Sequence, residues 1–166
     1  YGLVGSEMCI RDSIDIGLGT VSGTGNVPPF TASNSTNTPI SSVFTVLPYT
    51  DDGLTCEGDA VSFTFTVNPT PTVYGVGNQH GCSGFVTTEV TFLGSVAGTV
   101  YHWEIDNTTI GLGTAIGTNV FPSFTTVNTT GSTITATVTV TPRYTNLGVM
   151  CEGTPEEFTI TVYSEP

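Results

Sequence analysis

Few residues in this chain could do acid–base or metal chemistry. The 166 residues include two histidines, His80 and His102, and a Ser-His-acid triad would need one of them as its base. Neither lies in a nucleophile-elbow context, and His102 alternates with Trp103 on an expected strand, which is typical of a solvated strand histidine. His80 and Cys82 are metal-ligand types, but two ligands do not make a zinc site. The sequence therefore predicts no catalytic residue and no enzyme activity.

The overall charge restricts the partners. The chain has 2 Lys plus Arg against 14 Asp plus Glu, a formal net charge of −12. A phosphate backbone or an anionic lipid surface would be repelled by such a chain, so we expect no nucleic-acid partner. No stretch approaches the roughly 18 apolar residues of a membrane span, and we expect no membrane insertion.

The first thirteen residues differ in composition from the rest. The run from Leu3 to Asp12, LVGSEMCIRD, resembles a translated sequencing-adapter sequence, an artefact found at the ends of metagenomic reading frames. Residues 1–13 are therefore expected to be non-native and are excluded from the reasoning about the fold. The alternative is a genuine N-terminal strand.

A tandem repeat organises the remainder. At an offset of 94 residues Ile16-Gly17-Leu18-Gly19-Thr20 falls on Ile110-Gly111-Leu112-Gly113-Thr114, and at 95 residues Cys56-Glu57-Gly58 falls on Cys151-Glu152-Gly153. Closely spaced prolines near Pro69 mark a boundary. We predict a C-terminal portion of a truncated repeat at residues 14–69 and a complete repeat at residues 70–166.

The secondary structure is predicted to be all-β. Strict alternation from Thr133 to Pro142 places apolar residues on one face of a strand and threonines on the other, and Gly-rich turns separate such runs at the spacing of a β-sandwich. The truncated unit lacks several strands, so we expect an open half-sandwich with Phe44, Phe63 and Phe65 uncovered. The core predicted for the complete unit comprises Phe92, Tyr101, Trp103, Val138, Val140, Phe158 and Ile160.

Two of the cysteines are expected to pair. Cys82 and Cys151 belong to the complete unit and could close a loop of about 70 residues, a disulfide worth roughly 4 kcal/mol in the chain-entropy model. The natural partner of Cys56 would then lie in the missing part of the first unit. Such a bridge implies an oxidising compartment, whereas three reduced thiols are the alternative.

One acidic cluster precedes the last expected strand of each unit. The clusters are Asp51, Asp52, Glu57 and Asp59 in the first unit and Glu152, Glu156 and Glu157 in the second. Carboxylates are calcium ligands, so a calcium site is one interpretation, although the spacing matches no EF-hand or nonapeptide pattern. The interpretation we favour is a set of solvated acids that keep the chain soluble, with no cofactor.

These motifs together resemble the PKD-like repeats of large Bacteroidetes surface proteins. The resemblance rests on the Tyr101–Asp106 run YHWEID, on Cys151-Glu152-Gly153 and on the closing Phe158–Val162 run FTITV. It implies an immunoglobulin-like β-sandwich strung in arrays on secreted or surface proteins linked to adhesion. The chain has Asp106-Asn107-Thr108 where the better-known pattern has Gly-Asp-Gly, so no role is carried over for that turn.

We therefore expect a non-catalytic spacer or adhesion-type repeat of a secreted or cell-surface bacterial protein. Its partners would be the neighbouring repeats of the same chain and an extracellular glycan or protein. The alternatives are a carbohydrate-binding module, assisted by calcium, and an appendage of an extracellular hydrolase. The first alternative would require a row of exposed aromatic residues or a cup of acids on one face.

Overall fold

The regular secondary structure of the described residues is almost entirely β-strand, with one 3-10 turn at Thr108–Ile110. The computed structural model describes residues 5–11, 15–51 and 55–164, with the backbone alone for 5–11, 51 and 55. Contacts divide the chain into two compact units, Tyr1–Pro69 and Thr70–Pro166. No helix among the described residues is long and apolar enough to cross a membrane. The expected all-β class is confirmed, and the division falls at the proline-rich segment.

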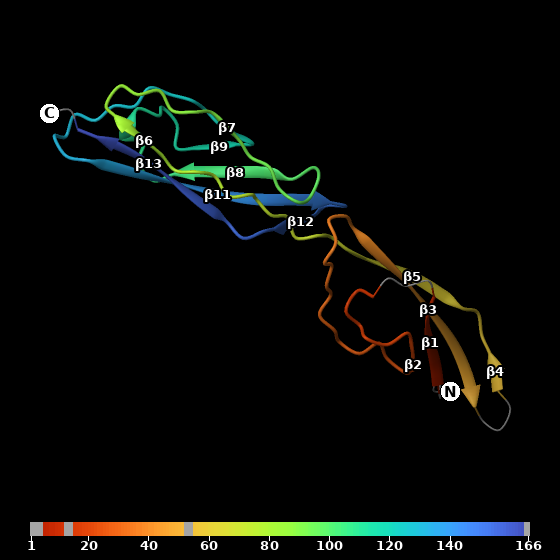
Figure 1. Cartoon of the computed structure of the whole chain (residues 1–166). Helices are drawn as coiled ribbons and strands as arrows, with labels where there is room; N and C mark the ends of the chain where they lie inside the picture. The colour runs from red at the N-terminus through yellow and green to blue at the C-terminus, as the bar shows by residue number, and fades with distance from the viewer. Residues whose placement is uncertain (1–4, 12–14, 52–54, 165–166) are drawn as a thin grey trace. The chain divides into compact units, whose positions relative to one another are not determined.

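The second unit is built on one six-stranded sheet (Figure 1). Its strands, in spatial order, are β6 (Gln79–Cys82), β13 (Glu156–Tyr163), β11 (Ile134–Asn146), β8 (Val100–Ile105) and β9 (Ile116–Thr118), and β12 (Val149–Glu152) pairs with the end of β11. The pairing of β6 with β13 is parallel, and the other pairings are antiparallel. Period-two alternation along β8, β11 and β13 turns their apolar residues to one face.

A thinner second layer covers that apolar face. It contains the antiparallel pair β7 (Val90–Thr91) and β10 (Val120–Phe121), together with extended segments that include a bridge between Val86 and Thr125. Phe121 is fully buried and makes edge-on ring contacts with Trp103 at 4.9 Å and Phe158 at 5.4 Å between centroids. These rings join the two layers. The seven predicted core residues, Phe92, Tyr101, Trp103, Val138, Val140, Phe158 and Ile160, are all buried.

The first unit is a single five-stranded sheet. Its strands are β1 (Gly5–Arg11), β2 (Ser22–Thr24), β3 (Ile40–Asp51), β4 (Thr55–Glu57) and β5 (Val61–Val67), with β3 paired to β1, β4 and β5. Residues 1–13 were excluded from the fold reasoning, whereas the structure places the strand β1 at Gly5–Arg11. β1 pairs with Val43–Tyr49 of β3, the stretch equivalent to the part of β11 that pairs with β8 in the second unit. An unpaired strand edge accepts another extended segment, whatever its composition.

The apolar face of this sheet is partly uncovered. Phe63 and Phe65 are 45% and 43% exposed, as expected for a sheet without a second layer. Phe44 departs from the expectation, since it is only 1% exposed. Ile16 packs beside it, and Phe30 and Phe63 stack against its ring, so a loop and a neighbouring strand take the place of the missing layer.

The two units share their strand register and their loop contacts. Ile40 pairs with Val67 as Ile134 pairs with Val162, in agreement with the sequence offsets. An asparagine before the long strand makes the same side-chain bonds in each: the Asn128 amide donates to the carbonyls of Ser132 and Val162, and the Asn34 amide donates to those of Thr38 and Val67. Two backbone hydrogen bonds also recur. Ser33 N–H donates to the Ile16 carbonyl as Val127 N–H donates to that of Ile110, and Gly58 N–H donates to the Pro48 carbonyl as Gly153 N–H donates to that of Pro142.

Candidate functional site

The expected disulfide between Cys82 and Cys151 is not formed, and both are free thiols. The strand register explains why. Cys82 pairs with Tyr163 at the end of β13, whereas Cys151 pairs with Tyr144, beyond the opposite end of β13. The two cysteines therefore lie at opposite ends of the six-stranded sheet, where Figure 1 places β6 and β12.

Their separation can be measured along β11. Cys82 pairs with Tyr163, which follows Val162, the partner of Ile134, so Cys82 lies beside the Ile134 end of β11. Cys151 pairs with Tyr144, near the other end of β11. Ten residues of strand at a rise of about 3.3 Å span roughly 33 Å. A disulfide needs Cα atoms within about 7 Å, so this pairing within one unit is excluded. The expectation was wrong because it considered the loop length and not the direction of the last strand.

The acidic residues proposed as calcium ligands are not gathered by this fold. Among the described residues, no three His, Cys, Asp or Glu side chains are placed to hold a metal ion. Glu152 accepts a 2.8 Å bond from Arg143 Nε in an ion pair. Glu57 stands on β4, Asp59 follows it in an exposed loop, and Glu156 opens β13. Asp52 and the side chain of Asp51 lie outside the described residues.

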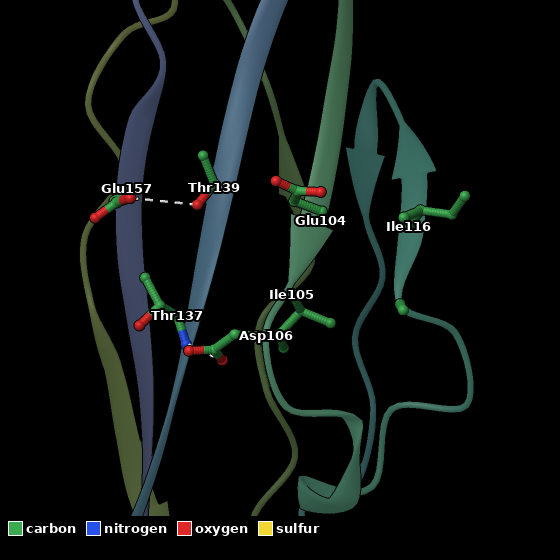
Figure 2. A pocket seen from close by; sticks show the side chains of 8 residues that line it. Glu104, Ile105, Asp106, Ile116, Thr137, Thr139 and Glu157 are labelled. Carbon is green, nitrogen blue, oxygen red and sulfur yellow. Dashed lines mark hydrogen bonds between the residues drawn. The ribbon is translucent and has the colours of Figure 1, made fainter.

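Several polar side chains cluster on the outer face of the second unit's sheet. Because side chains alternate along a strand, residues next to the buried ones point outward. Thr137 and Thr139 of β11, Glu104 of β8 and Glu157 of β13 are such residues, and they line one hollow together with Asp106, which follows β8. The remaining lining residues are Ile105, Ala115 and Ile116. Figure 2 shows the three carboxylates around the threonines.

Two of the three carboxylates are held by β11. Glu157 accepts a 3.3 Å hydrogen bond from the Thr139 hydroxyl, and Asp106 accepts a 2.8 Å bond from the Thr137 N–H (Figure 2). The carboxylate of Glu104 makes no hydrogen bond to any residue that the structure describes, and the residue is exposed. The hollow has a volume of about 480 Å³. Fixed acceptors beside hydroxyl donors are suited to polyhydroxylated or cationic ligands.

A second hollow continues along the same face. Its volume is about 280 Å³, and it shares Glu104 and Ile116 with the first. His102, Thr141 and Arg143 add a ring nitrogen, a hydroxyl and a guanidinium to its lining. Ile116 is 68% exposed and gives the surface between the two hollows an apolar patch. The outer face is therefore a polar strip with acids toward one end and a cation toward the other.

Tyr101 lies in the core, and its surroundings displace its pKa. Burial raises the pKa of Tyr101 above its ordinary value, and a hydrogen bond with Thr99 opposes that effect in part. Its ring contacts Phe92 at 6.2 Å between centroids. Tyr101 therefore belongs to the packing of the unit and stays protonated at neutral pH.

No motif in the sequence marked Glu104 or Asp106 as a site residue. A signal for Glu104 was present, because the alternation of Thr99 to Ile105 already places this residue on the outward face. What it could not show is which strands are neighbours.

Comparisons with family models, with curated proteins and with solved structures find no match to this chain.

Proposed function

We propose that the chain is part of an array of immunoglobulin-like, PKD-like β-sandwich repeats that acts as a non-catalytic spacer in a secreted or cell-surface bacterial protein. The observation that carries this proposal is the recurrence of register and loop contacts at the repeat offset, as in the pairs Ile40–Val67 and Ile134–Val162. A unit that recurs with its buried contacts intact is typical of modular arrays.

The path of the chain through the complete unit supports a spacer. The chain enters beside the link between β12 and β13, where the Pro71 carbonyl lies so close to Gly153 that a Cβ at that glycine would collide with it. It leaves at Tyr163, the other end of β13. Entry and exit at opposite ends let each repeat add its own length. The thirteen residues of β11 span roughly 43 Å at about 3.3 Å per residue.

The order of the strands suits such a unit to mechanical load. A pull on the two chain ends acts on the N-terminal end of β6 and on the C-terminal end of β13. These ends lie at opposite ends of a parallel ladder, from Gln79 opposite Ile160 to Cys82 opposite Tyr163. The force therefore runs along the ladder and loads its hydrogen bonds together. At one end of this ladder, Asn78 Oδ1 also accepts a 2.8 Å hydrogen bond from the Thr159 N–H.

Single-molecule pulling on the whole chain tests the proposal. We expect a resolved unfolding peak from the second unit, and a lower peak force in Asn78→Ala because one bond of the loaded ladder is lost. Arg143→Ala is the matched control, since its ion pair with Glu152 joins β11 to β12, outside the loaded ladder. A unit that yields without a resolved peak, or equal forces in the two variants, would contradict the proposal.

The hollow on the outer face favours a second candidate, a carbohydrate-binding module. Glu104, Asp106 and Glu157 form the cup of acids on one face that this alternative requires. Calorimetric titration with soluble polysaccharides, with and without calcium, tests it. A saturable heat that is lost in Glu104→Gln and Glu157→Gln but kept in Glu152→Gln would support it, because Glu152 is not among the lining residues. Absence of heat across the panel would contradict it.

A further inference from the structure

The second hollow on the outer face holds most of the basic side chains that the structure describes. Those side chains are Arg143, His80 and His102, and two of the three, Arg143 and His102, line this hollow. The chain as a whole is acidic, with a formal net charge of −12. The hollow therefore offers hydrogen-bond donors to an anionic group, directly beside a hollow that is lined by three carboxylates.

The strand register gives the layout of this second hollow. His102 pairs with Thr141 of β11 and with Thr118 of β9, so these three outward side chains form one row across three strands. Neighbouring strands lie about 4.8 Å apart, so the row is roughly 10 Å wide. Arg143 lies two residues beyond Thr141, and Glu104 lies two residues from His102 in the opposite direction. The row therefore has a cation on one side and an acid on the other.

Arg143 is held in place by its own unit. Its Nε donates a 2.8 Å bond to Glu152, and its side chain is still 37% exposed. A guanidinium has five N–H donors, so the Nη groups remain as donors beyond this ion pair. They suit a carboxylate, which accepts two parallel charge-assisted bonds from such a fork. His102 adds a ring nitrogen from the diagonal position on β8, about 7 to 8 Å away.

The acids of the first hollow lie well away from Arg143. Glu104 and Glu157 both pair with Thr139, which precedes Arg143 by four residues, or about 13 Å of strand. This distance exceeds the screening length of about 8 Å at physiological ionic strength, so one carboxylate bound at Arg143 escapes most of their repulsion. A second carboxylate over Thr139 would meet both acids. The face therefore accepts an isolated negative charge and opposes a run of them.

The remaining groups of the second hollow suit a sugar. Thr118 and Thr141 supply hydroxyls, the carboxylate of Glu104 is an acceptor with no described partner, and Ile116 presents an exposed apolar surface. The volume of about 280 Å³ lies at the lower limit of ligand pockets and favours one small group. Glu104 and Ile116, both labelled in Figure 2, also line the larger hollow, so a longer chain could continue into it.

We propose that the second hollow binds a uronic acid residue of an otherwise neutral polysaccharide. Arg143 and His102 hold the carboxylate, while Thr118, Thr141 and Glu104 bind ring hydroxyls. The neutral sugars on either side lie along the same face and reach the first hollow. This inference rests on the carbohydrate-binding candidate and names its ligand class.

NMR titration of the isotope-labelled whole chain, kept free of divalent cations, tests the proposal. The probes are a neutral xylo-oligosaccharide, the same oligosaccharide carrying one glucuronic acid branch, an oligogalacturonate and the peptide Gly-Asp-Gly. We expect the branched probe to bind about fivefold more tightly than the neutral one, the size of a good exposed ion pair. Its amide shifts should gather at His102, Thr118 and Thr141. The oligogalacturonate and the peptide should bind more weakly than the branched probe.

Two variants make the assignment specific. Arg143→Gln should bring the affinity for the branched probe down to that for the neutral one. Thr135→Val is the matched control and should leave the ratio of the two affinities unchanged, because Thr135 stands on β11 outside the lining of both hollows. The ratio compares two ligands on one variant, so a partial loss of folding does not alter it.

The outcomes separate this inference from the candidate on which it rests. Equal affinities for the neutral and branched probes, or an unchanged ratio in Arg143→Gln, would overturn the uronate site and leave a carbohydrate-binding module standing. Binding of the oligogalacturonate or of Gly-Asp-Gly as tight as that of the branched probe would also overturn it, in favour of a polyanion or an acidic peptide. Absence of binding by every oligosaccharide would contradict the carbohydrate-binding candidate itself.

Discussion

Removal of the Phe121 ring should strongly destabilise the complete unit. Phe121 is 0% exposed and its ring contacts those of Trp103, Phe124 and Phe158, so it touches both layers. Truncation of a buried Phe to Ala costs about 3 to 5 kcal/mol, because the cavity collapses only in part. Domains of this size are stable by about 5 to 15 kcal/mol, so Phe121→Ala should remove a large fraction of the stability.

Urea unfolding followed by tryptophan fluorescence measures this loss. Trp103 is the single tryptophan, is 4% exposed and donates its indole N–H to the Val120 carbonyl at 2.9 Å, so its emission reports on the second unit alone. With an m-value of about 1.5 kcal/mol/M, a loss of 4 kcal/mol lowers the midpoint by about 2.7 M. Val120→Ala is the control, since its side chain is 38% exposed, and it should cost under about 1 kcal/mol. A cost below about 1 kcal/mol for Phe121→Ala would refute the two-layer core.

Three further predictions concern the same unit. Asn128→Ala should lower its free energy of unfolding by about 1 to 3 kcal/mol in the urea assay, because the buried amide is the donor to two backbone carbonyls; an unchanged midpoint would contradict this. Gly117→Ala should destabilise the unit and shift the Trp103 emission, since a Cβ there would collide with the indole, whereas Gly113→Ala meets no atom within 4 Å and serves as control; equal effects would contradict the packing. Because the pKa of Tyr101 is raised in the folded state, its protonated phenol contributes fully to the stability of the unit below the unfolded-state pKa of about 10. This contribution is lost as the pH rises through the folded-state pKa. The melting temperature should therefore fall above pH 10 more steeply in the parent than in Tyr101→Phe, and parallel curves would count against that burial.

Local patterns in the sequence predicted the faces of the strands well. Alternation alone placed Tyr101 and Trp103 inward, and both are buried, because a strand that covers a core repeats with period two. Phe121 was not selected, since it lies on a two-residue strand in a stretch with no alternation to read. Its burial follows from where the second layer crosses the sheet, which is a tertiary property.

Long-range placement was less accessible to sequence reasoning. The predicted Cys82–Cys151 disulfide was wrong because the two cysteines lie near opposite ends of β13. The sequence shows only that they bracket one long loop. The strand at Gly5–Arg11 was missed because its pairing depends on the open edge of β3 more than on its own composition. The hollow beside Glu104 needs three strands as neighbours, and no spacing in the sequence specifies that order.

Small-angle X-ray scattering on chains with one, two and three copies of the complete unit tests the central claim most directly. If the chain enters a repeat at one end and leaves it at the other, the maximum dimension should grow linearly, by about 40 Å per copy, as the length of β11 indicates. A dimension that grows only with the cube root of the mass would show that the repeats collapse on one another, and it would contradict the proposal that they act as spacers.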